Sequence, residues 1–575
     1  MNAILLILLA IAIFVGAYLT YGRWLAKQWG IDPKNVTPAH EMEDGVDYVP
    51  AKAPVLMGHH FSSIAGAGPI NGPIQAAFFG WVPVFLWIVI GGIFFGAVQD
   101  FGSIFVSIRH KGKSLGEVIE ENIGHKCKVL FTVFAWLVLI LVVAAFAAIV
   151  ASSFTITDPS VTGIFPGAVA GTSNGSVAMA SILFIPLAIG FGFFVYRKNA
   201  NVAISTIVGV VLLAACVAIG LICPINLPKN FWLVFVFIYV IIASVTPVWI
   251  LLQPRDYLSS FLLYFMIAAA VIGIIGAGIA DPASITFTTP AFVGFKVGSN
   301  YLFPVLFITV ACGAVSGFHS LIGSGTTSKQ LDNEAEALPI GYGAMLIECV
   351  LAVISLIAVG VLSADGSIAA TGLASPTLVF ATAISNFFAV IGFPAVAVTA
   401  TFTIIALAVS AFCLTSLDTA TRLGRFMFQE LFAGKGEKKN ILSNMYVATV
   451  VTAVCGALLC IAGYAKIWPL FGACNQLVAV PAFLALAVYL AKKGKNNKML
   501  YFPMVFMLVA TVSSLILSLK NNILKFVDGT ASILTEGLQC VLIVPIVVLA
   551  VILVIEGGKV LIATEKANKE AKKAA

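Results

Sequence analysis

The most informative property of this sequence is how few charged residues it contains. Only 10% of its 575 residues are Asp, Glu, Lys or Arg, whereas 60% are hydrophobic, and the mean hydropathy is +1.06. A soluble domain needs a far more polar surface, so this composition excludes one. The apolar runs are about 20 residues long, which as a helix crosses a hydrocarbon core of ~30 Å, and strand-length alternating segments are missing. We therefore expect an all-α polytopic membrane protein.

The sequence also lacks the patterns that hold metals or form catalytic centres. None of the 10 cysteines is spaced as CxxC, and most lie inside apolar runs, so neither a zinc site nor a disulfide framework is indicated. The segment 40–44 reads HEMED and lacks the second histidine of a zinc-protease helix. We expect no metal, no cofactor and no enzymatic activity.

Basic residues exceed acidic ones, giving a net charge of +7, but they are divided among short loops between apolar runs. Positive charge in such loops sets the orientation of a membrane protein, so we expect a lipid bilayer and no nucleic acid as partner. Residues 3–22 are apolar and are followed by Arg23 rather than preceded by basic residues. This order is the reverse of a cleavable signal, and it predicts a permanent span.

The apolar runs predict about 15 spans. With the N-terminus outside, most of the 32 Lys and Arg fall on one side, which we assign to the cytoplasm together with the C-terminus. If the apolar stretch 377–391 crossed the membrane it would export a strongly basic loop, so we expect it to be an external, membrane-lying helix. The spans are predicted near residues 3–22, 58–80, 82–108, 129–151, 178–196, 202–222, 231–252, 258–280, 302–323, 340–363, 393–417, 443–463, 467–491, 499–519 and 535–558.

The second predicted span carries helix-breaking residues at its centre, namely Gly66, Gly68, Pro69, Gly72 and Pro73. Such a helix should break at mid-membrane, where the freed backbone groups must be buried in protein or line a wet cavity. Asn71 would then cap a second half-helix. Its free amides, near Ile74 and Gln75, would favour an anion.

A second interruption is predicted within 231–252, where Ser244, Thr246 and Pro247 disturb another apolar run. This span would run in the opposite direction to the first broken one. Matching breaks in opposite orientation are typical of a five-plus-five inverted repeat, with the substrate held between the broken helices. The residues that we expect to bind substrate are Gly66, Gly68, Asn71, Gly72, Ile74, Gln75, Ser244 and Thr246.

The predicted repeat divides the chain into four parts. The two halves would comprise residues 58–222 and 231–417. An N-terminal helix and cytoplasmic loop, 1–57, would precede them. A basic loop and four helices, 418–575, would follow as a scaffold or a dimer contact.

Several polar residues lie where lipid would not tolerate them. Asp100 and Glu348 lie within predicted spans, and His319 shares a helix face with Ser316 at i and i+3. Each could bind a coupling proton, because a buried carboxylate or imidazole can exchange one. Helix-to-helix hydrogen bonds are the alternative, and the Ser and Thr oxygens after His319 could instead coordinate Na⁺.

Further polar residues suggest a relay and a gate. His59 and His60 are adjacent and would diverge on a helix, so we expect hydrogen bonding or proton relay rather than shared metal binding. Asp418 and Arg422 are four residues apart, which predicts an internal salt bridge at the cytoplasmic end of a span, acting as a gate. Ordinary positive-inside anchoring is the alternative for the arginine.

Seven motifs spread over the chain resemble those of the carbon starvation protein A family. They are HHFSSIAGAGPINGP (59–73), AVQDFGSIF (97–105), SLGEVIEENIG (114–124), GFHSLIGSGTTSK (317–329), GYGAMLIE (341–348), LDTATRLGRFMFQEL (417–431) and WPLFGACNQL (468–477). The resemblance implies a LeuT-like transporter of the amino acid-polyamine-organocation superfamily in the bacterial inner membrane. It implies import of pyruvate or small peptides under nutrient limitation, by proton symport.

Other functions remain open from the residues alone. A Na⁺-coupled carrier of amino acids or organic anions is the main alternative. A divalent-metal transporter lacks acidic or Met ligands in the predicted breaks, and a membrane enzyme lacks a motif. For a peptide, Asp100 or Glu348 would have to receive the α-ammonium group.

Overall fold

The computed structural model describes residues 1–155, 172–198, 201–373, 375–432, 440–461 and 464–574. Within these ranges the strands form one short hairpin, β1 (Lys296–Val297) with β2 (Asn300–Tyr301), and the other regular elements are helices. Eleven helices of this described part are long and apolar enough to cross a membrane. The prediction of a multi-pass helical membrane protein is therefore confirmed.

The described residues of the first half of the chain form 13 α-helices. They are α1 (Ala3–Ala17), α2 (Arg23–Trp29), α3 (Pro38–Glu41), α4 (Ala53–Ile64), α5 (Gly68–Ala76), α6 (Trp81–Gly91), α7 (Ala97–Ile108), α8 (Leu115–Asn122), α9 (His125–Phe154), α10 (Thr172–Gly192), α11 (Val202–Ile222), α12 (Lys229–Val245) and α13 (Leu252–Ala280). Short π-helical turns join α1 to α2 and α6 to α7, so each pair forms one long helix.

The second half contains the remaining helices of the described residues. They are α14 (Leu302–Thr309), α15 (Ala311–Ala314), α16 (Gly317–Gly325), α17 (Ala344–Leu362), α18 (Pro376–Ile391), α19 (Ala395–Phe432), α20 (Met445–Cys460), α21 (Tyr464–Lys492), α22 (Tyr501–Val527) and α23 (Leu538–Ala574).

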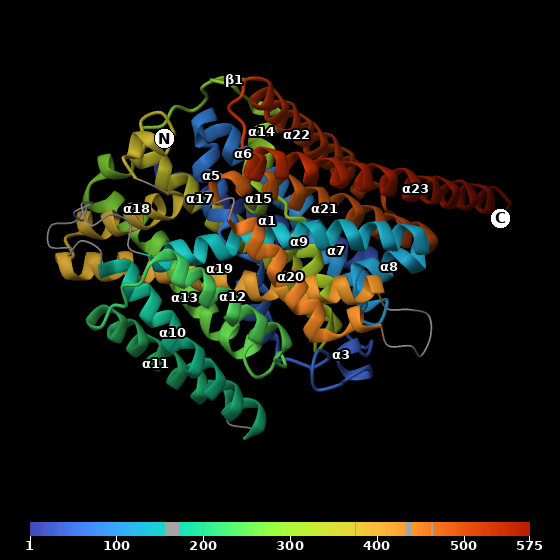
Figure 1. The fold of residues 1–575 in the computed structure, drawn as a ribbon, viewed down its shortest axis with the longest axis horizontal. Coiled ribbons are helices and arrows are strands. Elements are labelled where there is room, and N and C mark those ends of the chain that lie inside the picture. Colours follow the sequence, from blue (N-terminus) through green and yellow to red (C-terminus); the bar gives the residue numbers. More distant parts are fainter. Residues whose placement is uncertain (156–171, 199–200, 374, 433–439, 462–463, 575) are drawn as a thin grey trace.

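Long helices α9 and α19 pack along each other and form the centre of the bundle (Figure 1). Both α12 and α20 contact this pair, whereas α10 and α11 pack mainly on one another at the edge. The two termini lie toward opposite ends of the long axis (Figure 1). Since α1 and α23 run along this axis, the axis follows the expected direction of the membrane normal.

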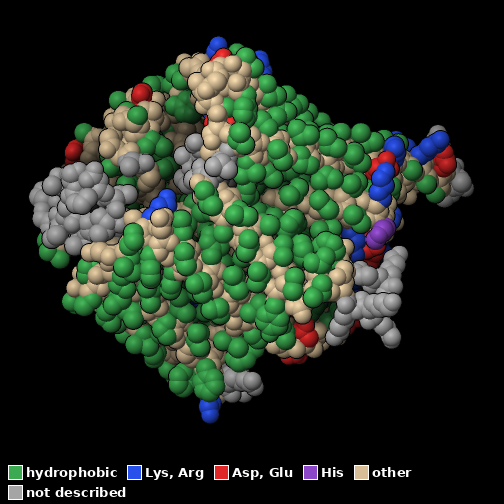
Figure 2. Space-filling model, in the orientation of Figure 1, with side chains coloured by type: hydrophobic (Ala, Val, Ile, Leu, Met, Phe, Trp, Pro, Cys, Tyr) green, Lys and Arg blue, Asp and Glu red, His purple; other side chains and the backbone are tan. Residues whose placement is uncertain are grey.

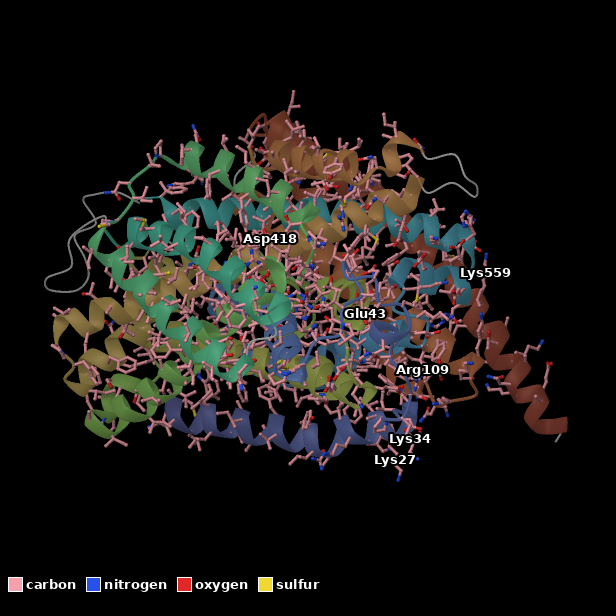
Figure 3. All side chains as sticks on the ribbon, turned by 90° about the horizontal axis from the view of Figure 1, so that it is seen from below. Lys27, Lys34, Glu43, Arg109, Asp418 and Lys559 are labelled. Atoms are coloured by element: carbon pink, nitrogen blue, oxygen red, sulfur yellow. The ribbon has the colours of Figure 1, made fainter. Side chains whose placement is uncertain are left out.

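The surface is apolar over most of the face shown in Figure 2, and its few charged side chains lie mostly at the edges, with several of them toward the right. Ile204, Ile207 and Val211 of α11 follow helical spacing and are between 62% and 66% exposed. Lipid is the solvent for such a stripe. Lys27, Arg109 and Lys559, from distant segments, lie toward one end of the molecule (Figure 3).

Four of the predicted spans are not single long helices. Those near 58–80 and 302–323 are interrupted, and those near 231–252 and 443–463 correspond to the short helices α12 and α20. The stretch 377–391 corresponds to α18, which packs against α13, α17 and α19.

The predicted break of the second span is confirmed. Helix α4 ends at Ile64 and α5 begins at Gly68, so residues 65–67 are not helical. A second broken helix is formed by α14, α15 and α16, which is interrupted at Val315 and Ser316. It packs against α4 and α5.

The interruption predicted within the span 231–252 is wrong. Helix α12 ends at Val245 and α13 begins at Leu252, so Thr246 and Pro247 lie in a connection between two helices. The physical reason is that Pro247 disfavours the helical conformation for the residue before it, so Thr246 is extended and α12 ends at Val245. The next helix begins only at Leu252, and Pro254 is tolerated in its first turn, where no helical hydrogen bond is lost.

Candidate functional site

The first break lies where α4 and α5 meet the central helices α9 and α19. The hydroxyl of Ser416 on α19 donates to the carbonyl of Ser63, 3.1 Å away, and so satisfies one of the backbone groups freed by the break. A Cβ at Gly66 would lie 2.9 Å from Ser416 Oγ and 3.0 Å from the Phe146 ring of α9. Glycine at this position therefore lets the unwound backbone approach both helices.

Gly68 and Gly72 hold the two broken helices together. A Cβ at Gly68 would lie 2.4 Å from the side chain of Cys312, and one at Gly72 would lie 2.6 Å from the carbonyl oxygen of Thr309. The spacing of four residues places both glycines on one face of α5, as in small-residue packing of membrane helices. This face contacts α14 and α15 directly, whereas we had expected both glycines to contribute to substrate binding.

The cap role predicted for Asn71 is wrong. Helix α5 begins at Gly68 with Pro69 in its first turn, so Asn71 lies inside the helix, and its backbone N–H donates to the carbonyl of Ala67 at 2.8 Å. Ile74 and Gln75 lie in the last turn, away from the end with free amides. The first proline of the cluster starts the helix because a proline fits the first turn.

The second break is held by amide side chains from two other helices. Oδ1 of Asn475 on α21 accepts the amide hydrogen of Phe318 at 2.7 Å, and Nδ2 of Asn475 donates to Ser316 Oγ at 3.0 Å. Nε2 of Gln99 on α7 donates to the carbonyl of Ser316 at 2.7 Å. Asn475 thus caps α16 from outside, a function that the sequence gives no local sign of.

Beside this second break, three titratable groups meet that we singled out separately from the sequence. Nδ1 of His319 on α16 lies 2.9 Å from Oδ2 of Asp100 on α7. Its Nε2 lies 3.6 Å from Oε2 of Glu348 on α17. All three side chains are 0% exposed. We call this group the Asp–His–Glu triad.

The triad has hydrogen-bonding capacity left over. Among the described residues, Oδ1 of Asp100, Nε2 of His319 and both carboxylate oxygens of Glu348 have no hydrogen-bond partner. Buried polar atoms are normally satisfied, so such atoms point to a site that exchanges protons or changes partners. Two carboxylates beside one imidazole suit a proton, because complete ionisation would leave a net negative charge in a dry site.

A second buried cluster surrounds Arg255, near the start of α13. Its guanidinium donates to Asp256 Oδ1 at 2.6 Å through Nη2, and Nη1 donates to the Tyr239 hydroxyl at 2.5 Å and to the carboxylate of Asp418. Nδ1 of His59 on α4 lies 2.8 Å from Asp256 Oδ2. We call these five residues the Arg255 cluster, and it ties α4, α12, α13 and α19 together.

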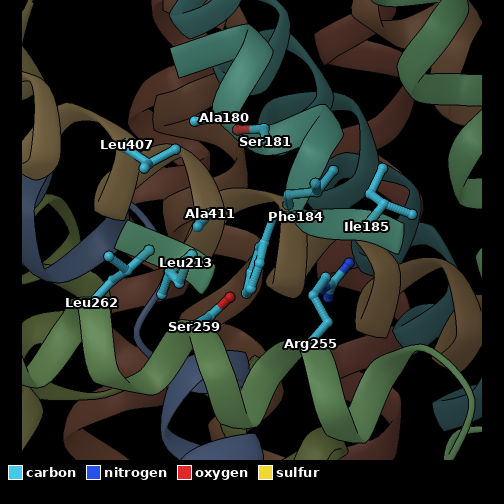
Figure 4. Close-up of a pocket in the computed structure, with 11 residues that line it drawn as sticks. Ala180, Ser181, Phe184, Ile185, Leu213, Arg255, Ser259, Leu262, Leu407 and Ala411 are labelled. Carbon is cyan, nitrogen blue, oxygen red and sulfur yellow. The ribbon is translucent and has the colours of Figure 1, made fainter. Parts of the chain in front are cut away.

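Arg255 also lines a small cavity between α10, α11, α13 and α19 (Figure 4). Ser259, one turn further on α13, and Ser181 of α10 line it too, and both hydroxyls are buried without a hydrogen-bond partner among the described residues. The rest of its wall is largely apolar, with Phe184 between these helices. A small, largely apolar cavity therefore borders the cluster on one side.

The salt bridge predicted between Asp418 and Arg422 is wrong. Asp418 binds Arg255 instead, and Arg422 lies 3.3 Å from Asp47 and donates to the carbonyls of Ala243 and Thr246. Those carbonyls end α12, where the negative end of the helix dipole favours a cation. Interhelical partners therefore replace the local partner four residues away.

The remaining predicted residues lie close to these groups or at helix ends. His60 Nδ1 lies 2.7 Å from the hydroxyl of Thr327, which follows α16, so His60 joins the two broken helices. Ser244 Oγ lies 3.4 Å from Thr449 Oγ1 of α20. Thr246 ends α12, and its hydroxyl donates to the carbonyl of Ile242.

Comparison with known proteins gives a consistent set of relatives. The family model described as "Carbon starvation protein CstA" matches residues 2–372 and 366–514. Proteins named "Peptide transporter CstA" from Campylobacter jejuni and Bacillus subtilis are 33% and 31% identical, and the alignments cover 89% and 87% of this chain and 79% and 87% of theirs. The "Pyruvate/proton symporter BtsT" of Escherichia coli is 31% identical over 91% of this chain and 82% of its own.

Among solved structures, that of MhsT in complex with L-phenylalanine matches 87% of this chain and 99% of its own, with a TM-score of 0.48 and 12% identity.

Proposed function

Because this chain belongs to the CstA family of carbon starvation proteins, we propose that it imports pyruvate or small peptides as a secondary active transporter, driven by protons. The observation that carries the proposal is the juxtaposition of two broken helices with a fully buried Asp–His–Glu triad at one of the breaks. Broken helices supply backbone groups for a substrate, and a buried triad supplies a site for a proton.

The proposed architecture is a LeuT-like inverted repeat with boundaries that differ from the sequence prediction. The first half would comprise α4 to α13, residues 53–280, with α10 and α11 as an inserted pair. The second would comprise α14 to α21, residues 302–492. Each half begins with its broken helix. Helix α9 of the first half corresponds to α19 of the second. The last two helices of the halves also correspond, α12 to α20 and α13 to α21. Contacts of α12 and of α20 with both α9 and α19 support this correspondence.

Helices α1 and α2 would then precede the repeat, and α22 and α23 would follow it. The chain would cross the membrane about 15 times, with α18 as an external helix. The N-terminus would lie outside the bacterial cytoplasmic membrane and the C-terminus inside it. The gathering of Lys27, Arg109 and Lys559 toward one end of the molecule supports this orientation (Figure 3).

In the proposed cycle the substrate lies between the unwound backbone at Gly66 and that at Ser316. The triad takes up a proton from outside and loses it inside. His319 lies in the first turn of α16, so a change in its ion pairs acts on the helix that forms part of the substrate site. Proton binding and substrate binding would thus favour the same arrangement of α16, which is the requirement for coupling.

Uptake into proteoliposomes tests the function. Labelled pyruvate and labelled glycylglycine are each supplied with an imposed proton gradient, an imposed Na⁺ gradient, or no gradient. Accumulation driven by protons alone is the expected result. Accumulation driven by Na⁺ alone would identify Na⁺ instead of the proton as the coupling ion. Accumulation of neither compound under any gradient would refute the proposed substrates.

A further inference from the structure

A cavity of about 310 Å³ lies between the end of α19, the turn after α16 and the start of α8. It is separate from the triad and from the cavity beside Arg255. Its wall includes Lys329, Glu430, Ser114 and Phe426. Lys329 ends the GSGTTSK motif, and Glu430 lies within the last turn of α19. Neither residue has a role in the proposed proton or substrate site.

Lys329 supplies a cation to this cavity. Its ammonium lies 4.8 Å from the centre of the Phe426 ring and 5.2 Å from that of Tyr48. In the described part of the chain no carboxylate lies within salt-bridge distance of it. Aromatic rings hold the ammonium in place without neutralising it, so its charge remains available to an anionic group.

Glu430 supplies a carboxylate to the same cavity. Its Oε2 atom is buried, and among the described residues it accepts no hydrogen bond. A buried carboxylate oxygen without a donor is costly unless a ligand or a cation supplies one. Within the described part of the chain, the cavity is therefore lined by an ammonium group without a carboxylate partner and by a carboxyl group with one unpaired oxygen.

We propose that this cavity binds a zwitterionic di- or tripeptide, with Lys329 holding the peptide carboxylate and Glu430 holding the α-ammonium group. The proposal rests on the proposed function and selects peptides over pyruvate. An extended dipeptide spans about 7 Å, and a volume near 300 Å³ is at the lower end for small-molecule sites. Pyruvate, which has no ammonium group, would leave Glu430 without its donor.

The position suits a vestibule on the way out of the central site. Lys329 ends the short 3₁₀ turn Thr327–Lys329 that continues α16, and Glu430 is twelve residues after Asp418 on α19. The same turn carries Thr327, which contacts His60 of the first broken helix. A peptide leaving the breaks along α16 would meet Lys329 and Glu430 at the predicted cytoplasmic end.

Binding of glycylglycine to the purified full-length protein in lipid nanodiscs tests this site without transport. Two analogues each lack one charge: N-acetylglycylglycine lacks the ammonium and glycylglycinamide lacks the carboxylate. Glu430→Gln should weaken glycylglycine binding about ten- to 100-fold, the effect of losing a charged hydrogen bond, and should leave N-acetylglycylglycine unchanged. Lys329→Gln should weaken glycylglycine similarly and leave glycylglycinamide unchanged.

Glu121→Gln is the matched control, because Glu121 pairs with Lys113 at the surface of α8, outside the cavity. It should bind all three compounds as the wild type does. Equal weakening of every compound by Glu430→Gln would indicate a structural role and overturn the proposal, as would absence of glycylglycine binding to the wild type. Proton-driven uptake of pyruvate alone would overturn the peptide site and leave the proposed transport function standing.

Discussion

The Arg255 cluster allows a quantitative test of what holds α13 to α19. In Arg255→Met the carboxylate of Asp418 keeps the Tyr239 hydroxyl, 2.9 Å away, as its remaining described partner. Asp256 keeps His59 at 2.8 Å and Thr415 at 3.1 Å. Removing one partner of a buried ion pair costs about 3–5 kcal/mol, because the other charge stays buried. We expect Arg255→Met to lose that much unfolding free energy.

The reciprocal change should cost less. In Asp418→Asn, Arg255 still binds Asp256 through Nε at 3.1 Å and Nη2 at 2.6 Å, so the loss is that of a charged hydrogen bond, about 1.5–3 kcal/mol. The double variant no longer buries an unpaired carboxylate at position 418. Its destabilisation should therefore fall below the sum of the two single effects by about 0.5–3 kcal/mol.

Unfolding of the purified variants by sodium dodecyl sulfate in mixed micelles measures these differences. Arg23→Met provides the control, since Arg23 is exposed on α2 and should change stability by less than about 0.5 kcal/mol. A loss below about 1 kcal/mol for Arg255→Met, or additive effects in the double variant, would refute the cluster as a buried, coupled unit.

Three further predictions concern the broken helices and the residues that contact them. Gly68→Ala should abolish uptake, because the added Cβ would lie 2.4 Å from the Cys312 side chain. The control Gly190→Ala should transport normally, because no atom lies within 4 Å of a Cβ at that position. Normal uptake by Gly68→Ala would refute the close packing. Glu348→Gln should still exchange substrate across proteoliposomes but lose accumulation under a proton gradient, and an unchanged response to pH would remove Glu348 from coupling. Asn475→Ala should lower the unfolding free energy by about 1–3 kcal/mol, because it leaves the buried amide of Phe318 without an acceptor, and unchanged stability would contradict the capping role.

The helices of this molecule could be predicted from the sequence better than the contacts between residues that are distant in the sequence. Long apolar runs and the Gly-Pro cluster after His59 are local signals, so the membrane helices and the first break could be predicted. The second break carries no proline, and Pro247 gave a stronger but misleading signal. A break held by Asn475 depends on a helix more than 150 residues away, and local patterns do not report such a contact.

The same limit applies to the charged residues. Asp100, His319 and Glu348 could each be recognised as buried titratable groups, yet Asp100 and His319 are 219 residues apart and their pairing depends on the tertiary fold. For Asp418 the residue at i+4 offered a local partner. Asp418 instead pairs with Arg255, because Arg255 is itself fully buried and requires carboxylates from two helices.

A triad with one imidazole between two carboxylates has a thermodynamic consequence if it carries one proton per cycle. A zwitterionic peptide moving with that proton transfers one net positive charge, for which a potential of 100 mV supplies about 2.3 kcal/mol, or about 50-fold accumulation. Pyruvate moving with the same proton transfers no net charge and would respond to the difference in pH alone. The electrical response of this transporter therefore reports the charge of its cargo.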